Sequence, residues 1–471
     1  MRVLPLLVLS TAGVNAIRGH PDTYHTTKYQ PEGPYPSLAE IYAARDTAPS
    51  SSPTSNVQGV AFDRIVHIWL ENIDYDDAAN NQDMQWIANQ GLLLTNYWAV
   101  THPSQPNYAA TVAGDYFGMD HDDLVAFPEN ISTIVDLLDT KHISWGEYQE
   151  NMPYAGFQGM NFSNRETGAS DYVRKHNPLM LFDSVALNET RRSQIKNFTA
   201  FYEDLRRERL PQWSFITPNM TNDAHDTNLT FSARWTRNFL TPLLQNPHFT
   251  RDTLIVLSFD ESDRYDVQNR VFTVLLGDAI PPALRGKTDS TFYTHYSGIS
   301  TVSFNWGLGS LGRWDCQAEP FALVRQKYER GYLRRDYGPQ PGDGYNIDAN
   351  LLWYNQSYAG PVSENMTTTL WPVPETRYEC VGGPVLDSIK KVWGTDGGSY
   401  WYGSRLEPDG GLELEQEAGE ERDARAWLAM CFGGRGRGSY VGNTCGERPT
   451  TKYFPVKRLV PTEERVWREW K

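Results

Sequence analysis

Two near-continuous apolar runs, each followed by acidic residues, constrain the fold of this chain most strongly. Phe62–Leu70 has the sequence FDRIVHIWL and precedes Glu71-Asn72; Thr253–Phe259 has the sequence TLIVLSF and precedes Asp260-Glu261. Such runs are typical of strands buried on both faces of a parallel sheet. Because sites in open α/β sheets lie at the carboxyl ends of the strands, the residues that follow both runs are candidate site residues.

Weaker patterns of the same kind alternate along the chain. They predict helices over about 83–91, 107–113, 131–138, 197–209 and 231–244, and further strands over 92–100, 142–148, 212–217 and 270–276. This alternation predicts an α/β fold with a central, mostly parallel sheet and helices on both faces.

The segment 101–108, THPSQPNY, brings a serine, a histidine and an asparagine together at the start of a short helix. Pro106 suits a first helical turn, and Gly114 suits a C-cap. Ser104 would then lie at or just before the helix N-terminus, where free N–H groups and the helix dipole favour a phosphate oxygen and a developing alkoxide. Taken alone, Ser104 fits a simple N-cap serine better than a nucleophile.

Charge and targeting signals indicate a soluble, exported protein. The formal net charge of −15 leaves no basic surplus for nucleic acid, so we expect no such partner. Residues 1–16 have the short basic start, apolar stretch and small-residue end of a secretory signal peptide. No later segment has the roughly 18 uninterrupted apolar residues of a membrane span. We therefore expect a secreted or cell-wall-associated protein.

Glycosylation and cysteine signals agree with export. Eight Asn-X-Ser/Thr sequons predict N-linked glycans, at Asn130, Asn161, Asn188, Asn197, Asn219, Asn228, Asn355 and Asn365. Asn219 is the exception: it follows the predicted strand 212–217, where site residues are expected, so we expect no glycan there. Four cysteines, Cys316, Cys380, Cys431 and Cys445, are expected to form disulfides, with three connectivities open.

Composition divides the chain into four parts. After the signal peptide, residues 17–57 are rich in Pro, Ser, Thr and Tyr and are interpreted as an arm lying over the surface. Residues 58–370 would form a catalytic domain with a C-terminal extension. Residues 371–471, with cysteines, glycine clusters and an acidic run, form a tail without an assigned role.

Four polar clusters fall at loop ends of the predicted sheet: Glu71-Asn72, Ser104 with Asn107, His225, and Asp260-Glu261. Oxygen-rich clusters suit Mg²⁺, Ca²⁺ or Mn²⁺, and mixed oxygen and nitrogen sets suit zinc. A divalent metal there would acidify the serine hydroxyl for attack on a phosphoester. Asn107 could donate to a phosphate oxygen, and a histidine could protonate the leaving group.

Seven motifs in order carry a family resemblance: Glu71-Asn72, His102–Asn107 (HPSQPN), Trp145–Asn151 (WGEYQEN), Arg174–Pro178 (RKHNP), Asn222–Asp226 (NDAHD), Phe259–Ser262 (FDES) and Thr294–Ser297 (THYS). Together they resemble the secreted acid phosphatases of filamentous fungi. That phosphoesterase family includes bacterial phosphocholine-hydrolysing phospholipases C and lies within the alkaline phosphatase superfamily. The resemblance covers roughly 58–312 and implies an alkaline phosphatase-like fold.

The resemblance also implies roles for individual residues. Glu71, Asn72, Asp260 and Glu261 would hold the metal, with Ser104 completing the set as the nucleophile that becomes phosphorylated. Two-metal members carry an aspartate after the proline of a strand-end loop, where this chain has Pro218-Asn219. We therefore expect one metal, with the histidines His176, His225 and His295 supplying positive charge in place of a second cation. His102 is expected to support the site.

These observations predict a metal-dependent acid phosphatase that hydrolyses small phosphate monoesters through a phosphoserine. Two alternatives remain open at this point: a phospholipase C-type phosphodiesterase, and a non-catalytic secreted glycoprotein that kept the fold. The metal's identity, the natural ester and the oligomeric state do not follow from the sequence.

Overall fold

The computed structural model of the chain describes residues 36–117, 119, 121–316, 318–325, 379–380 and 383–393. The predicted signal peptide, the start of the arm and most of the tail lie outside these residues. So do Cys431, Cys445 and the sequons at Asn355 and Asn365. The four-part division of the chain stays a prediction.

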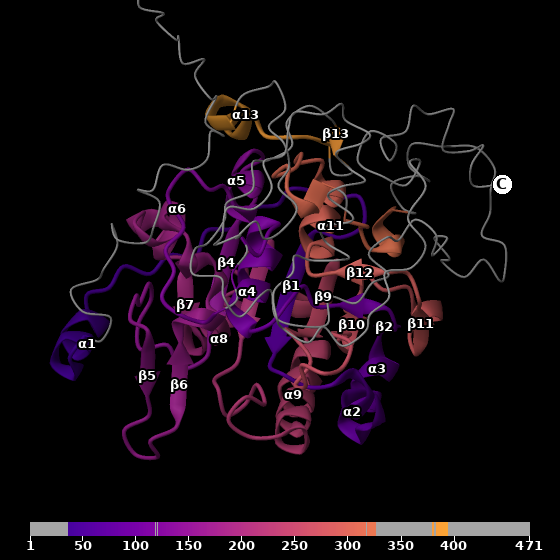
Figure 1. The fold of residues 1–471 in the computed structure, drawn as a ribbon, viewed down its shortest axis with the longest axis horizontal. Coiled ribbons are helices and arrows are strands. Elements are labelled where there is room, and N and C mark those ends of the chain that lie inside the picture. Colours follow the sequence, from indigo (N-terminus) through magenta and orange to yellow (C-terminus); the bar gives the residue numbers. More distant parts are fainter. Residues whose placement is uncertain are drawn as a thin grey trace, which may run out of the picture.

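An eight-stranded sheet forms the centre of the molecule, in the order β11-β2-β10-β9-β1-β8-β4-β7 (Figure 1). Only β10 runs antiparallel to its neighbours in this sheet, so the sheet is mostly parallel, as predicted. Its strands are β1 (Arg64–Leu70), β2 (Leu92–Leu94), β4 (Trp145–Gln149), β7 (Ile195–Asn197), β8 (Trp213–Thr217), β9 (Thr253–Phe259), β10 (Thr273–Leu276) and β11 (Lys287–Asp289).

The two apolar runs are neighbouring central strands. β1 and β9 pair in parallel, with Leu70 opposite Phe259. All seven residues of β9 are buried, and so are the last six of β1, because the sheet is covered on both faces. The register places Glu71 and Asp260 side by side at one sheet edge, where the Asp260 N–H donates to the Leu70 carbonyl at 3.0 Å.

The helices flank the sheet in two groups. Helix α4 (Ser104–Ala113) contacts α11 (Ser297–Trp306), and its Tyr108 packs on Trp69 of β1 with ring centroids 4.9 Å apart. Helix α9 (Leu229–Leu244) contacts α3 (Gln82–Gln90) and α10 (Pro247–Thr250), and α8 (Phe198–Arg206) contacts β4 and β7. Helices on both faces of the sheet confirm the predicted fold class.

Shorter elements complete the described chain. The remaining α-helices are α1 (Leu38–Arg45), α2 (Tyr75–Asn80), α5 (Ile134–Asp139), α6 (Asp183–Ala186), α7 (Glu189–Arg192) and α13 (Asp387–Trp393). The 3₁₀ turns are η2 (Arg174–His176), η3 (Pro178–Leu181), η4 (Pro282–Leu284) and η5 (Trp314–Cys316). Two-stranded sheets pair β3 (Tyr97–Trp98) with β12 (Tyr293–Thr294), β5 (Asn161–Ser163) with β6 (Ser170–Val173), and β13 (Glu379–Cys380) with β14 (Gly383–Pro384).

The strand predicted over 92–100 is two strands in different sheets. β2 pairs with β10 and β11, whereas β3 pairs with β12. The Thr95 N–H donates to Asp289 and the Tyr293 N–H donates to the Asn96 carbonyl, so the chain changes partners between the two strands. Only Thr95 and Asn96 interrupt the apolar residues of 92–100 at this change, and two polar residues are too short a break to predict the end of a strand.

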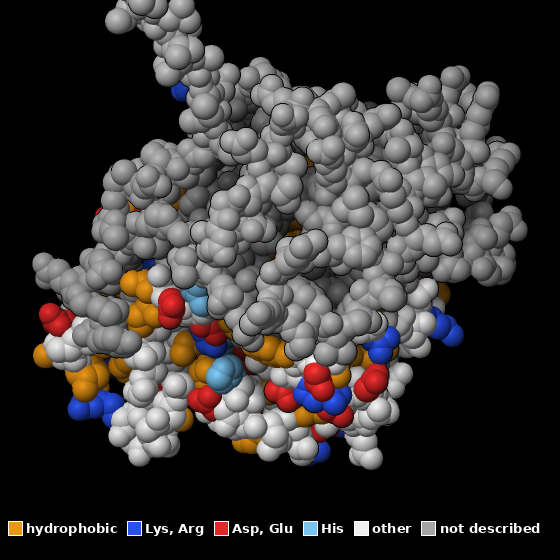
Figure 2. All heavy atoms as spheres, viewed as in Figure 1, with side chains coloured by type: hydrophobic (Ala, Val, Ile, Leu, Met, Phe, Trp, Pro, Cys, Tyr) orange, Lys and Arg blue, Asp and Glu red, His pale blue; other side chains and the backbone are white. Residues whose placement is uncertain are grey.

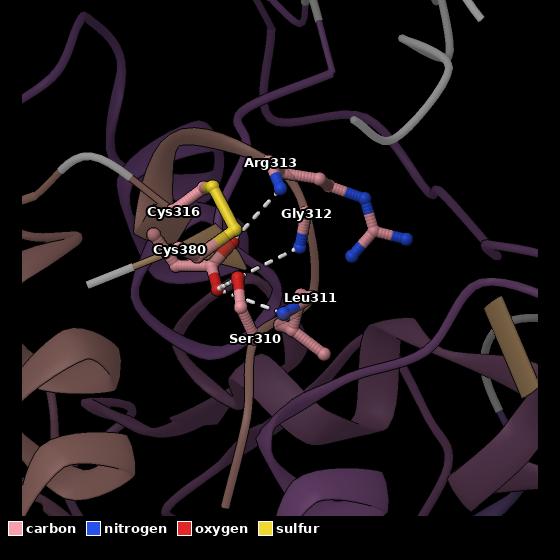
Figure 3. Close-up of a disulfide and its surroundings, with 7 residues drawn as sticks. Ser310, Leu311, Gly312, Arg313, Cys316 and Cys380 are labelled. Atoms are coloured by element: carbon pink, nitrogen blue, oxygen red, sulfur yellow. Dashed lines mark hydrogen bonds between the residues drawn. A yellow bond between two sulfur atoms is a disulfide. The ribbon is translucent and has the colours of Figure 1, made fainter. Parts of the chain in front are cut away.

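One disulfide joins Cys316 to Cys380 across 64 residues of sequence (Figure 3). Beside it, Asp315 accepts from the N–H groups of Leu311 and Arg313 and from the hydroxyl of Ser310. The Arg313 guanidinium donates to the Ala113 carbonyl at 2.8 Å, at the end of helix α4. The disulfide loop is therefore tied to the C-terminal end of the helix that begins with Ser104.

The end of the predicted arm lies against the domain. Ser55 donates to the Gln212 side chain at 2.6 Å, and the Lys196 ammonium donates to the Ser52 hydroxyl at 2.7 Å.

On the face in Figure 2, acidic and basic side chains of the described residues are intermingled. No helix within the described ranges is both long and apolar enough to cross a bilayer.

Candidate active site

Ser104 is the first residue of helix α4, and its hydroxyl faces the acidic residues. Pro103 occupies the N-cap position, and Gly114 ends the helix at φ 75°, as its predicted C-cap role requires. Ser104 Oγ lies 3.1 Å from Glu71 Oε2, 3.3 Å from Glu261 Oε1 and 3.4 Å from Asn72 Oδ1. The simple N-cap interpretation is therefore wrong, because Pro103 is the N-cap residue and the Ser104 hydroxyl hydrogen-bonds to side chains of the acidic strand ends.

The acidic residues come from the ends of β1 and β9. Glu71, Asp260 and Glu261 are fully buried. The Asn72 N–H donates to Asp260 Oδ1 at 3.1 Å, which joins the two strand ends. Asn72 has a φ of 26°, a strained value for a residue other than glycine. The structure thus brings Glu71, Asn72, Ser104, Asp260 and Glu261 together.

A third loop adds Asp223, which the sequence reasoning did not select. It follows β8, the other neighbour of β1, and its carbonyl accepts from the Glu71 N–H at 3.0 Å. His176, on turn η2, lies between the two carboxylates: its Nε2 is 3.3 Å from Glu71 Oε1 and its Nδ1 is 3.7 Å from Asp223 Oδ2. One ligand atom from each of the three residues lies within 4.8 Å of the others, so they could hold a metal ion.

The carboxyl groups repel one another in a dry environment. Burial, with the charges of Asp260 and Asp223, raises the pKa of Glu71 well above its usual range. Burial raises the pKa of Asp260 to about 7. Burial and Asp260 likewise raise the pKa of Glu261, and burial raises that of Asp223. Such a cluster is stable only when it is protonated or neutralised by a cation.

The donor set fits a divalent cation. Asp260 Oδ2 is buried and accepts no hydrogen bond from any residue the structure describes. Carboxylate oxygens with one imidazole nitrogen are ligands for Mg²⁺, Mn²⁺ or Zn²⁺. Two sets of candidate metal ligands share Glu71. One is the triad of Glu71, His176 and Asp223. The other, expected from the sequence, joins Glu71 to Asn72, Ser104, Asp260 and Glu261.

Burial works against the positive charge that the sequence analysis expects of the histidines His176 and His295. Burial lowers the pKa of His295 to about 3, and its Nε2 lies 2.5 Å from the Asp260 carbonyl, which it orients. Burial, Lys175 and His225 hold the pKa of His176 well below its usual value. A neutral His176 suits metal ligation better than charge compensation.

His225 and His102 occupy different environments. The His225 side chain is 30% exposed, its Nδ1 lies 2.9 Å from Asp226 Oδ1, and its ring centroid is 5.9 Å from that of His176. It therefore faces solvent at the edge of the site. His102 is buried, and its Nδ1 lies 2.5 Å from Glu261 Oε2. This contact fits the supporting role expected for His102, since it orients the carboxylate next to Ser104.

Asn107 organises the loop before the helix. Its Oδ1 accepts from the N–H groups of Val100 and Thr101, and its Nδ2 donates to the carbonyls of Thr101 and Pro103. Both amide hydrogens are thus engaged, and a phosphate oxygen would have to replace one of these carbonyls. A direct role for Asn107 in phosphate binding stays a prediction.

Two further residues at the site were missed from the sequence. The Tyr108 hydroxyl donates to Glu71 Oε1 at 2.5 Å. The Lys175 ammonium lies next to the cluster; its burial would lower its pKa, but attraction to Asp122 and Glu71 outweighs this and raises it. Tyr108 lies one helical turn after Ser104, and Lys175 lies in the RKHNP motif, so both had a signal in the sequence.

Comparison with known protein families identifies the class of protein. The sequence profile described as "Phosphoesterase family" matches residues 75–309. That range contains Ser104, His176, Asp223, Asp260 and Glu261. The chain belongs to the phosphoesterase family.

Curated relatives cover most of the chain. It is 54% identical over 373 residues to an acid phosphatase of Aspergillus fumigatus, a match that covers 78% of this chain and 81% of the relative. It is 52% identical over 356 residues to a phosphate-repressible acid phosphatase of Penicillium chrysogenum, covering 76% and 83%. Among solved structures, a protein in the alkaline phosphatase superfamily from Vibrio parahaemolyticus matches 54% of this chain and 67% of its own, with 11% identity and a TM-score of 0.36.

Proposed function

We propose that this protein is a secreted acid phosphatase that transfers the phosphoryl group of a monoester to Ser104 and then to water. One observation carries the proposal. Ser104 Oγ, at the N-terminus of helix α4, lies 3.1 Å from Glu71 Oε2 and 3.3 Å from Glu261 Oε1. A nucleophile beside proton acceptors and a helix N-terminus suits attack on an anionic ester. The names of the fungal relatives support the monoesterase over other esterases.

The first step forms a bond between Ser104 Oγ and phosphorus and breaks the bond between phosphorus and the ester oxygen. Glu71 Oε2 is the nearest acceptor for the hydroxyl proton. His225, at the solvent edge, is assigned to protonate the departing alcohol. In the second step water attacks phosphorus and gives a proton to His225, the bond between phosphorus and Oγ breaks, and Ser104 takes back the proton that Glu71 accepted.

We assign one divalent cation to the acidic cluster, with Glu71, Asp260 and Glu261 as its central oxygen ligands. Asn72 and Ser104 complete the set, and His176 with Asp223 extends it. When bound, such a cation lowers the pKa of the serine hydroxyl and neutralises phosphoryl oxygens. His102 and His295 keep the ligands oriented through Glu261 Oε2 and the Asp260 carbonyl.

The test compares substrates on the purified full chain, with and without a chelator. We expect hydrolysis of p-nitrophenyl phosphate at acid pH, its loss in chelator and its return on adding a divalent metal. Release of phosphocholine from phosphatidylcholine at a higher rate than monoester hydrolysis would favour the phosphodiesterase alternative. Inactivity on every phosphoester, with no bound metal, would favour the non-catalytic glycoprotein.

Export has its own test. The full chain, expressed in a fungal host, is expected in the medium with a mature N-terminus at Ile17. A protein retained in cells with Met1 intact would contradict the proposed secretion.

A further inference from the structure

Lys175 is held at the edge of the acidic cluster by Asp122. Its Nζ lies 2.7 Å from Asp122 Oδ2, and the side chains are 18% and 28% exposed, respectively. Lys175 directly precedes His176 on turn η2. The ion pair therefore holds a positive charge on the residue before His176, and the His176 ring contacts Glu71.

The same carboxylate also binds the start of the nucleophile helix. Asp122 Oδ1 accepts from the backbone N–H of Gln105 at 3.0 Å, and Gln105 follows Ser104. The Gln105 side chain donates to the Asp123 carbonyl at 2.8 Å, a second tie between these segments. Asp122 thus fixes the position of the Lys175 ammonium relative to Ser104.

The ammonium acts on the cluster and keeps free donors. Its charge interacts with Glu71, Asp223, Asp260 and Glu261, the carboxyl groups around Ser104. Of its three N–H donors, one serves Asp122, its hydrogen-bond partner among the described residues. The other two have no partner among the described residues and are available to an anion, and lysine binds phosphate as a compact point charge.

We propose that Lys175 binds the non-bridging oxygens of the phosphoryl group during its transfer to Ser104, and that Asp122 is the residue that positions Lys175. This rests on the proposed phosphoryl transfer at Ser104 and adds a specificity determinant to it. A monoester presents three non-bridging oxygens, whereas a diester presents two. An ammonium fixed on the carboxylate that also binds the N–H of Gln105, the residue after the nucleophile, therefore favours monoesters.

The test measures kcat and KM for p-nitrophenyl phosphate and bis(p-nitrophenyl) phosphate, and inhibition by inorganic phosphate. The variants are Lys175→Met, Lys175→Arg and Asp122→Asn. Lys287→Met, which removes an exposed charge on β11, is the matched control. Thermal unfolding midpoints check folding, and Lys175→Gln replaces the methionine variant if that variant unfolds.

Loss of a charge-assisted hydrogen bond predicts that Lys175→Met weakens phosphate inhibition and lowers kcat/KM for the monoester by about 10- to 100-fold. The diester rate should fall much less, and Lys175→Arg should recover part of the loss. Asp122→Asn should raise KM for the monoester more than it changes kcat. Lys287→Met should leave all these values unchanged.

Equal losses on both substrates, or unchanged phosphate inhibition in Lys175→Met, would overturn the role of Lys175. Tighter phosphate binding in Asp122→Asn would show that Asp122 competes with phosphate instead of positioning the lysine. Ser104→Ala belongs in the same series: if it stays active, the proposed nucleophile is wrong whatever Lys175 does. An inactive Ser104→Ala beside an unaffected Lys175→Met would overturn only the present inference.

Discussion

Ser104 Oγ lies 3.1 Å from Glu71 Oε2, although 33 residues separate them in the chain. The contact joins the first residue of helix α4 to the carboxyl end of strand β1. Packing holds both ends in place, because Trp69 of β1 contacts Tyr108 of α4 with ring centroids 4.9 Å apart and the rings tilted by 58°. The nucleophile and the acidic cluster are therefore held as one rigid unit.

Tyr108→Phe removes the hydroxyl that donates to Glu71 Oε1 at 2.5 Å. That hydrogen bond lowers the pKa of Glu71, so its loss should make the carboxylate harder to ionise and weaken metal binding. We expect kcat/KM for p-nitrophenyl phosphate to fall by about 10-fold, in line with the net value of one hydrogen bond to a charged group. Higher metal concentration should restore part of the activity.

Tyr293→Phe is the matched control for this prediction. Tyr293 is also a buried tyrosine, and its hydroxyl donates at 2.8 Å to Asp289, which is not one of the carboxylates around Ser104. It should lower the unfolding midpoint without changing metal dependence. If both variants lose activity equally, the Tyr108 bond has no special role at the site.

The carboxyl cluster predicts how the stability of metal-free protein depends on pH. The pKa of Asp260 is raised from 3.8 to about 7 in the folded state. A carboxyl with a raised folded pKa binds its proton more tightly when folded, so stability is greatest below the unfolded pKa and falls as pH rises through the folded pKa. The unfolding midpoint of the metal-free protein should therefore decrease from about pH 4 to about pH 7.

Divalent metal should reverse this loss, and should raise the midpoint more at pH 7 than at pH 4, where protons compete for the ligands. Differential scanning fluorimetry with and without chelator measures both effects. A metal-free midpoint that rises steadily from pH 4 to pH 7 would contradict the account of the cluster.

The Cys316–Cys380 disulfide predicts a stability effect separate from catalysis. The double variant Cys316→Ser/Cys380→Ser should lose about 2–4 kcal/mol of unfolding free energy, since the bond closes a long loop. The kcat of the folded fraction should persist, because Arg313 still caps helix α4 at the Ala113 carbonyl. An unchanged free energy of unfolding in denaturant would show that the disulfide does not stabilise the folded chain.

Burial predicts which sequons carry glycans. Asn161, Asn188 and Asn228 are exposed, whereas Asn219 is 9% exposed and its Oδ1 accepts from two backbone N–H groups of its own loop. Peptide mass spectrometry of the secreted protein should find glycans at the first three and none at Asn219. A glycan at Asn219 would mean that this asparagine is modified before its loop folds.

The sequence predicted the strand ends because burial on both faces leaves a long apolar pattern. β9 matches its predicted bounds, and Glu71 and Asp260 lie where the end of a parallel strand pair must put them. The helix ending at Gly114 was predictable too, since φ 75° favours glycine. These features depend on local sequence or on the pairing of two strands.

The missed residues depend on the path of loops through space. Asp223 reaches Glu71 because β8 happens to be the other neighbour of β1, and Asp122 reaches Lys175 across 53 residues of sequence. Burial, which no local pattern reports, lowers the pKa values of His176 and His295 and so disfavours their charged forms. The pairing of Cys316 with Cys380 was one of three connectivities that spacing left open.

Acid quenching during turnover of p-nitrophenyl phosphate, followed by peptide mass spectrometry, tests the central claim most directly. The account predicts phosphate on the peptide that contains Ser104, and its absence in a folded Ser104→Ala variant whose kcat has fallen by about 10³-fold or more. A Ser104→Ala variant with full activity, or a phosphoryl group on another residue, would contradict it.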